Sequence, residues 1–341
     1  MFSISEFIRV NRFYFIWTIF LSVLYMFRSM FGLVFMTFIM CFIFAGIAHK
    51  LRRRYHWNRR TIVICLYMIF LFSEIAFITV VPPKLFAETV SFTEQLPKSI
   101  SSLRTWVETE FADNEFVAPI VTQIETSISP ENTVVSAWNV VRSALNKGAH
   151  YIGWFFLAML FSFLILLDLP ELSLGMRRLR YTKLAETYKE TADSIMLFAK
   201  VVGENFRAQL FISAINTSLT AIGLYALGVK AIALLCTIVF MCGLIPVLGM
   251  IISSVPIVLM AVNSGGIDLG LWALLMIVLI HLLEAYVLNP RIVSSVMHIN
   301  PVMTLIILYI AHTLLGLWGM LLGVPIAVYF YRKISFSTEK I

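Results

Sequence analysis

Several stretches of this 341-residue chain are apolar over enough residues to cross a lipid bilayer as helices. A hydrocarbon core of about 30 Å requires roughly 20 apolar residues in helical form. The expected spans are residues 13–27, 30–48, 61–81, 149–167, 208–228, 231–262, 268–288 and 301–331. Only 13% of the residues are charged, about half the fraction found in a soluble domain. The sequence therefore predicts an all-α membrane protein with about eight transmembrane helices.

The charges between these spans predict which side of the membrane each loop faces, because Lys and Arg are retained on the cytoplasmic side. Residues 49–60 hold six Lys or Arg and no acid, and residues 171–207 hold seven, so both are expected inside. Residues 84–148 carry eight acids against five bases and are expected outside. Apolar residues recur at helical spacing in the last two segments, which predicts amphipathic interfacial helices.

This patterning divides the chain into four parts. They are 1–83, with three spans ended by Pro82-Pro83; 84–148, an extracytoplasmic amphipathic segment; 149–207, a fourth span ended by Asp168-Leu169-Pro170 and a cytoplasmic amphipathic linker; and 208–334, a C-terminal transport core. The outer segment is expected to break near Ser129-Pro130. It is either a solvated cap packed on the spans or a lid over the substrate path.

The apolar tract 231–262 has 32 residues, too many for one helix at ordinary tilt and too few for two full crossings. Gly243-x-x-Pro246-x-x-Gly249 interrupts it, since proline removes a backbone donor and glycine relaxes the helix. Broken helices at membrane depth are tolerated where they are buried or line a cavity. Pro246 and Gly249 are therefore candidate pathway residues, acting through the backbone groups that they free. A single broken crossing gives eight spans with both termini inside, whereas a re-entrant hairpin places the C-terminus outside.

The segment Glu284–Arg291 places charges between two apolar runs. A charge at the bilayer centre costs roughly 2.5–3.5 kcal/mol on insertion scales, so such residues pair with one another or mark a transport pathway. His281 lies three residues before Glu284, so the two share a helix face on which they can relay protons or hold a cation. The alternative is a structural role, in which Glu284 is satisfied by Arg291 or by backbone exposed at Asn289-Pro290.

Asn216 belongs to a polar patch on the span 208–228 and either joins the pathway or bonds to another helix. The candidate pathway residues are thus Glu284, His281, Asn289, Pro290, Arg291, Pro246, Gly249 and Asn216.

Several of these residues stand in motifs that resemble the autoinducer-2 exporter family, the PerM-like permeases. The motifs are Ala221–Val229, Leu244–Gly249, Glu284–Val293, His298–Pro301 and Gly319–Pro325. Their order and spacing carry the resemblance over residues 205–331, whereas residues 1–204 match in layout alone. The resemblance implies about eight spans and transport of small molecules or ions without an ATPase domain. Some members of the family export a small furanosyl signal, and others are linked to sodium–proton exchange.

The sequence lacks the P-loop, His-Glu-x-x-His and Gly-x-Ser-x-Gly, so no enzyme activity, cofactor or metal is predicted. The formal net charge of +7 comes from loops beside apolar segments, which does not indicate nucleic-acid binding. We expect a multi-pass secondary transporter of the inner (plasma) membrane that works by alternating access. It is expected to export a small polar solute, and the resemblance implies a solute like autoinducer-2. Its expected coupling ion is a proton or sodium, and the alternative function is a sodium–proton antiporter. The glycine face Gly316-x-x-Gly319-x-x-x-Gly323 allows close helix approach and homo-oligomers.

Overall fold

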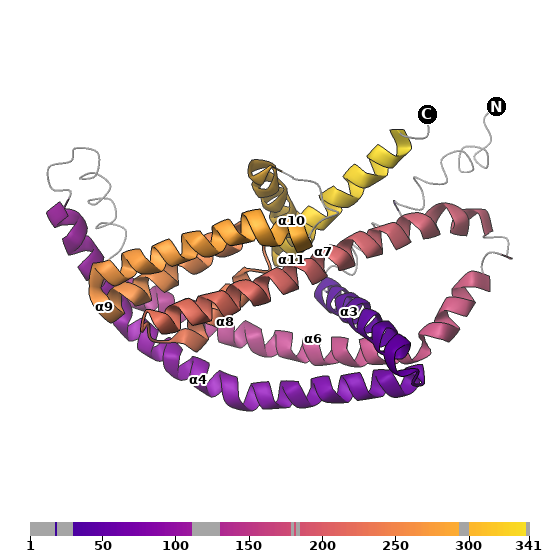
Figure 1. Cartoon of the computed structure of the whole chain (residues 1–341), viewed down its shortest axis with the longest axis horizontal. Helices are drawn as coiled ribbons and strands as arrows, with labels where there is room; N and C mark the ends of the chain where they lie inside the picture. The colour runs from indigo at the N-terminus through magenta and orange to yellow at the C-terminus, as the bar shows by residue number, and fades with distance from the viewer. Residues whose placement is uncertain are drawn as a thin grey trace. The chain divides into compact units, whose positions relative to one another are not determined.

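The computed structural model describes residues 18, 30–110, 130–178, 181, 185–292 and 300–338, and every regular element within them is a helix (Figure 1). The elements are α3 (Phe31–Tyr55), α4 (Arg59–Glu110), α6 (Pro130–Arg178), α7 (Ala185–Ala226), α8 (Ile232–Cys242), α9 (Leu248–Leu283), the π-helix η3 (Glu284–Leu288), α10 (Asn289–Ile292) and α11 (Pro301–Thr338). The expected all-α class is confirmed. Apart from residue 18, the first expected span, 13–27, lies outside the described residues.

Five helices among the described residues are long and apolar enough to cross a membrane. They are Phe31–Tyr55, Arg59–Glu110, Ile152–Arg178, Leu248–Leu288 and Val302–Tyr331. The expected span 208–228 lies at the end of α7, which is not one of the five. Polar residues dilute that part of α7, and the count of about eight spans stays a prediction.

Proline does not end the helices where the sequence suggested that it would. α4 continues through Pro82 and Pro83 and runs for 52 residues, and α6 continues through Pro170. The helices therefore run past the prolines at which two spans were expected to end, and the ends of the membrane spans stay a prediction. Each proline removes one backbone hydrogen bond, and the helix keeps its other bonds on both sides of it. By contrast α6 begins at Pro130, the position where a missing N–H costs least.

The structure divides into two compact units, the first made of residues 1–72, 150–207 and 306–341. In this unit Phe35 of α3 packs edge-on against Phe206 of α7 and against Trp318 of α11. Between α4 and α6, the hydroxyl of Tyr67 donates to Ser162 Oγ at 2.8 Å, and both side chains are buried. These contacts join the apolar helices of the unit to one another.

α11 is bent at Gly316, whose φ of 59° and ψ of −140° suit glycine alone. The two arms fold against each other, because a Cβ built on Gly323 would lie 2.9 Å from Ala311 Cβ. A Cβ on Gly319 would clash with the carbonyl oxygen of Ala311. The close helix approach predicted for this glycine face is confirmed, and its partner is the other arm of the same helix.

The second unit comprises residues 73–149 and 208–305 and contains the site described below. α9 bends at Gly265 and Gly266, so residues 248–264 and 267–283 form two arms. A buried cluster joins these arms to α7 and α8 through Leu224, Leu235, Ile257, Met260, Ala273 and Ile277. Since Leu235 and Ile257 share this cluster, the first arm of α9 returns alongside α8.

The second half of α4 packs onto this cluster. Phe92 lies against the buried core, and Glu88 Oε2 accepts a hydrogen bond from the backbone N–H of Leu234 at 2.7 Å. The amide of Asn263, near the bend of α9, donates to Gln95 Oε1. The start of the segment 84–148 thus packs on the core, and the choice between a cap and a lid stays open.

Candidate functional site

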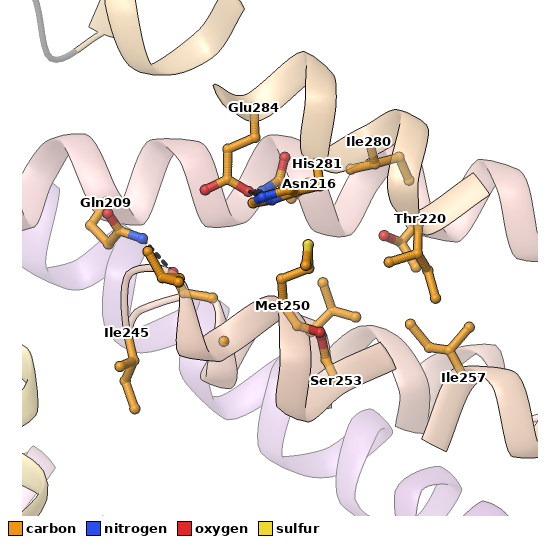
Figure 2. A pocket seen from close by; sticks show the side chains of 15 residues that line it. Gln209, Asn216, Thr220, Ile245, Met250, Ser253, Ile257, Ile280, His281 and Glu284 are labelled. Carbon is orange, nitrogen blue, oxygen red and sulfur yellow. Dashed lines mark hydrogen bonds and ion pairs between the residues drawn. The ribbon is translucent and has the colours of Figure 1, made fainter. Parts of the chain in front are cut away.

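A cavity of about 50 Å³ lies in the second unit between α7, the turn after α8 and both arms of α9 (Figure 2). Its polar lining side chains are Gln209, Asn216, Thr220, Ser253, His281 and Glu284. Four of the predicted pathway residues line the cavity, namely Asn216, Gly249, His281 and Glu284. The described lining does not include Pro246, Asn289, Pro290 or Arg291.

Glu284 follows directly on α9, and only 17% of its side chain is exposed. Asn216 Nδ2 donates to Glu284 Oε2 at 2.6 Å, which is a short, charge-assisted hydrogen bond between α7 and η3. His281 Nδ1 lies 3.9 Å from the same oxygen, too far for a hydrogen bond. None of the described lining residues is Lys or Arg. The carboxylate is therefore largely buried beside an amide and an imidazole, and the imidazole is the one group of the described lining that can carry a positive charge.

Two polar atoms beside this carboxylate have no hydrogen-bond partner among the described residues. They are Asn216 Oδ1 and His281 Nδ1, and both are shielded from solvent. Buried polar groups in folded proteins are nearly always paired, so an unpaired one indicates a place for water, an ion or another ligand. The predicted proximity of Glu284 and His281 is confirmed, and the structure adds Asn216 as the direct partner of Glu284.

The polar face of α7 binds the broken end of α8. Gln209 Nε2 donates to the carbonyl oxygen of Gly243 at 2.6 Å, and Ser213 Oγ donates to that of Phe240 at 2.7 Å. The last carbonyls of any helix lack partners within the helix, so these side chains satisfy groups that the break leaves free. Sequence reasoning missed Gln209 and Ser213, although Gln209 lies four residues before Ser213, and Ser213 lies three residues before Asn216, on one helical face.

The turn between α8 and α9 confirms the predicted break and shows how it is built. The N–H of Leu248 donates to the carbonyl oxygen of Pro246 at 2.7 Å, which makes Val247 the centre of a three-residue turn. Val247 has φ 64° and ψ −55°, a strained conformation for a β-branched residue. A Cβ on Gly249 would lie 2.1 Å from the carbonyl oxygen of Cys242. Pro246 and Gly249 therefore shape this turn through their backbone, while their part in a transport pathway and the placement of the two arms in the bilayer stay predictions.

The predicted break at Asn289-Pro290 takes the form of a widened helical turn. Residues Glu284–Leu288 form η3, in which the N–H of Asn289 bonds to the carbonyl oxygen of Glu284. Pro290 cannot donate and its ring crowds the preceding turn, and a π-turn relieves both constraints. α10 then continues over Asn289–Ile292. Asn289 is exposed. The structure does not describe the side chains of Pro290 and Arg291, so pairing of Arg291 with Glu284 stays a prediction.

Comparison with known proteins extends the resemblance beyond the C-terminal motifs. The family model described as "AI-2E family transporter" matches residues 14–338. A Bacillus subtilis (strain 168) protein named as a transport protein, YdbI, is 28% identical over 92% of this chain and 88% of its own length. The sodium-lithium/proton antiporter of Halobacillus andaensis is 22% identical over 84% of this chain and 82% of its own. A protein of Alkalihalophilus pseudofirmus, also named as a transport protein, is 24% identical over 75% of this chain and 67% of its own length.

The match of the family model covers nearly the whole chain, and the apolar helices agree with a multi-pass membrane protein. The chain belongs to the AI-2E family of transporters.

Proposed function

We propose that this chain is a cation-coupled secondary transporter of the inner membrane that moves a small polar solute. The observation that carries this proposal is Glu284, a largely buried carboxylate in a cavity whose described lining offers no Lys or Arg. Ionisable residues inside membrane segments are costly and mark ion or substrate pathways. Secondary transporters also place such sites beside discontinuous helices, as the turn between α8 and α9 does here.

The coupling ion in this proposal is a proton or sodium, and it binds at Glu284. Binding of a positive charge neutralises the buried carboxylate and so changes the relative free energies of the states that open to either side. Alternating access then follows from movement around the broken helices. The family resemblance makes an autoinducer-2-like furanosyl compound the first solute to test.

The second candidate is a sodium–proton antiporter, and two observations favour it. One relative carries the name sodium-lithium/proton antiporter. In addition, a cavity of about 50 Å³ has room for an ion and a few waters, since one water requires roughly 10–15 Å³ of such volume. A furanosyl compound would need a larger opening of the same site.

Flux into proteoliposomes tests both candidates. The wild type is compared with Glu284→Gln, which keeps the shape of the side chain and removes its charge. Glu171→Gln is the matched control, because Glu171 is 75% exposed and pairs with Arg60 at the surface. Autoinducer-2 uptake driven by a proton or sodium gradient, lost in Glu284→Gln and kept in the control, would support coupled solute transport.

Sodium–proton exchange without solute movement would instead favour the antiporter. Unchanged flux in Glu284→Gln would remove Glu284 from the mechanism. Absence of flux of either kind in the wild type would refute the proposed function.

A further inference from the structure

Asn216 presents an unpaired oxygen beside the buried carboxylate of Glu284. Its Nδ2 is committed to Glu284 Oε2 at 2.6 Å, and its Oδ1 is buried without a partner among the described residues. With Glu284 ionised, the opposite orientation of the amide would bring two oxygens to the same short distance and is disfavoured by repulsion. The amide oxygen therefore stays free for a ligand, and amide and carboxylate oxygens are the groups that hard cations bind.

The charge of the cavity restricts the class of that ligand. Glu284 is the one carboxylate among the described lining residues, and Gln209, Asn216, Thr220 and Ser253 are neutral. An anion would meet Glu284 without a compensating Lys or Arg from these residues. Divalent ions prefer several carboxylates, and the described residues contain no group of three His, Cys, Asp or Glu that could hold a metal ion. A single positive charge matches a single carboxylate.

The volume of the cavity bears on the size of that ligand. About 50 Å³ admits an ion with a few waters. Protein oxygens that face this space can take the place of waters around an ion, as they do in ion-selective sites of membranes. Figure 2 shows Glu284 of η3 and Asn216 of α7 directed toward each other, and the bond from Asn216 Nδ2 holds the amide beside the carboxylate.

From these observations we infer that Glu284 and Asn216 Oδ1 together bind one partly dehydrated monovalent cation of the sodium class. The inference rests on the proposed function and specifies the ion that couples to it. It also gives Asn216 a role in binding, beyond that of a bond between helices. His281, at 3.9 Å from Glu284, is the other titratable group of the described lining and lies beside the ion.

Equilibrium binding of radioactive Na⁺ to the purified full-length chain in detergent, at constant pH, tests the inference without any transport step. The wild type should bind one Na⁺ per chain in a saturable manner, and Li⁺ should displace it while choline should not. Asn216→Leu, which removes the oxygen at similar size, should weaken binding by about tenfold or more. Asn216→Asp keeps an oxygen at the same place and should retain binding.

Ser218→Ala is the matched control, because Ser218 lies on the same helix, is exposed and bonds to the carbonyl oxygen of Ala214. It should bind Na⁺ like the wild type. A thermal melt with and without NaCl shows whether each variant is folded. Na⁺ should raise the melting temperature of the wild type and of Asn216→Asp, and the rise should be larger for the protein that binds Na⁺ more tightly.

Lack of saturable Na⁺ binding by the wild type would overturn the inference, as would full binding by folded Asn216→Leu. Proteoliposomes that transport solute with a chain that does not bind Na⁺ would overturn this site and leave the proposed function intact. A chain that binds Na⁺ through Asn216 but shows no flux would support this site and refute the proposed function.

Discussion

Gly249 provides the sharpest test of how the break between α8 and α9 is built. An ideal Cβ at this position would lie 2.1 Å from the carbonyl oxygen of Cys242 and 2.6 Å from its carbonyl carbon. Both atoms belong to the backbone, so the clash cannot be relieved by rotation of a side chain. Gly249→Ala must therefore displace either the end of α8 or the first turn of α9. Overpacking of this kind typically costs about 1–3 kcal/mol, and a backbone partner places the expected loss near the upper value.

Gly46→Ala is the matched control for this substitution. Gly46 lies within α3, is exposed, and has no atom within 4 Å of its ideal Cβ. Alanine is favoured over glycine inside a helix by up to about 1 kcal/mol, so this variant should be as stable as the wild type or slightly more stable. Identical chemistry is thus expected to change the free energy of unfolding in opposite directions at the two sites.

Unfolding in detergent, followed by thermal melting and by titration with a denaturing detergent, measures both variants against the wild type. Should Gly249→Ala fail to accumulate, its level in the membrane relative to Gly46→Ala gives the same comparison. A Gly249→Ala protein that is as stable as the wild type would refute the close approach of Gly249 to Cys242.

The same unfolding assay checks three further predictions. Glu88→Ala should lower the free energy of unfolding by about 1 kcal/mol, because it removes the acceptor at the N-terminus of α8. Glu88→Gln keeps an acceptor and should lower the free energy of unfolding by less. Equal losses in the two variants would show that this bond is unimportant. Val247→Gly should stabilise the chain by about 1 kcal/mol by relieving the positive φ, so a lower melting temperature would contradict the strained turn. Tyr67→Phe should cost about 0.6–1 kcal/mol through the lost bond to Ser162, and a double-mutant cycle with Ser162→Ala that gives no coupling would disprove it.

The parts of the fold that the sequence predicted are those set by local composition. Apolar length correctly located four helices around the expected spans 30–48, 61–81, 149–167 and 301–331. Spans were expected to end at Pro82-Pro83 and Pro170, but the helices continue past these positions. A proline removes one backbone hydrogen bond, which a long helix can lose without ending.

The site was predictable in its components but not in its connections. Glu284 and His281 lie on one helix, so their spacing alone placed them together. Asn216 was a candidate on a separate span, and its bond to Glu284 depends on how α7 packs against α9. Gln209 and Ser213 were missed because their partners are backbone carbonyls of the broken helix, which leave no trace in side-chain chemistry. The bend at Gly316 was missed because glycine is also tolerated within straight helices.

The contacts of α4 with the core also set an order of assembly during synthesis. Glu88 and Leu234 are 146 residues apart, and Gln95 and Asn263 are 168 residues apart. These bonds cannot form until the ribosome has released α8 and the first arm of α9. Until then α4 satisfies its own hydroxyl groups, since Thr89, Thr93 and Ser99 each donate to the carbonyl oxygen four residues earlier. The nascent helix therefore leaves none of these three hydroxyls unpaired before α8 and α9 pack against it.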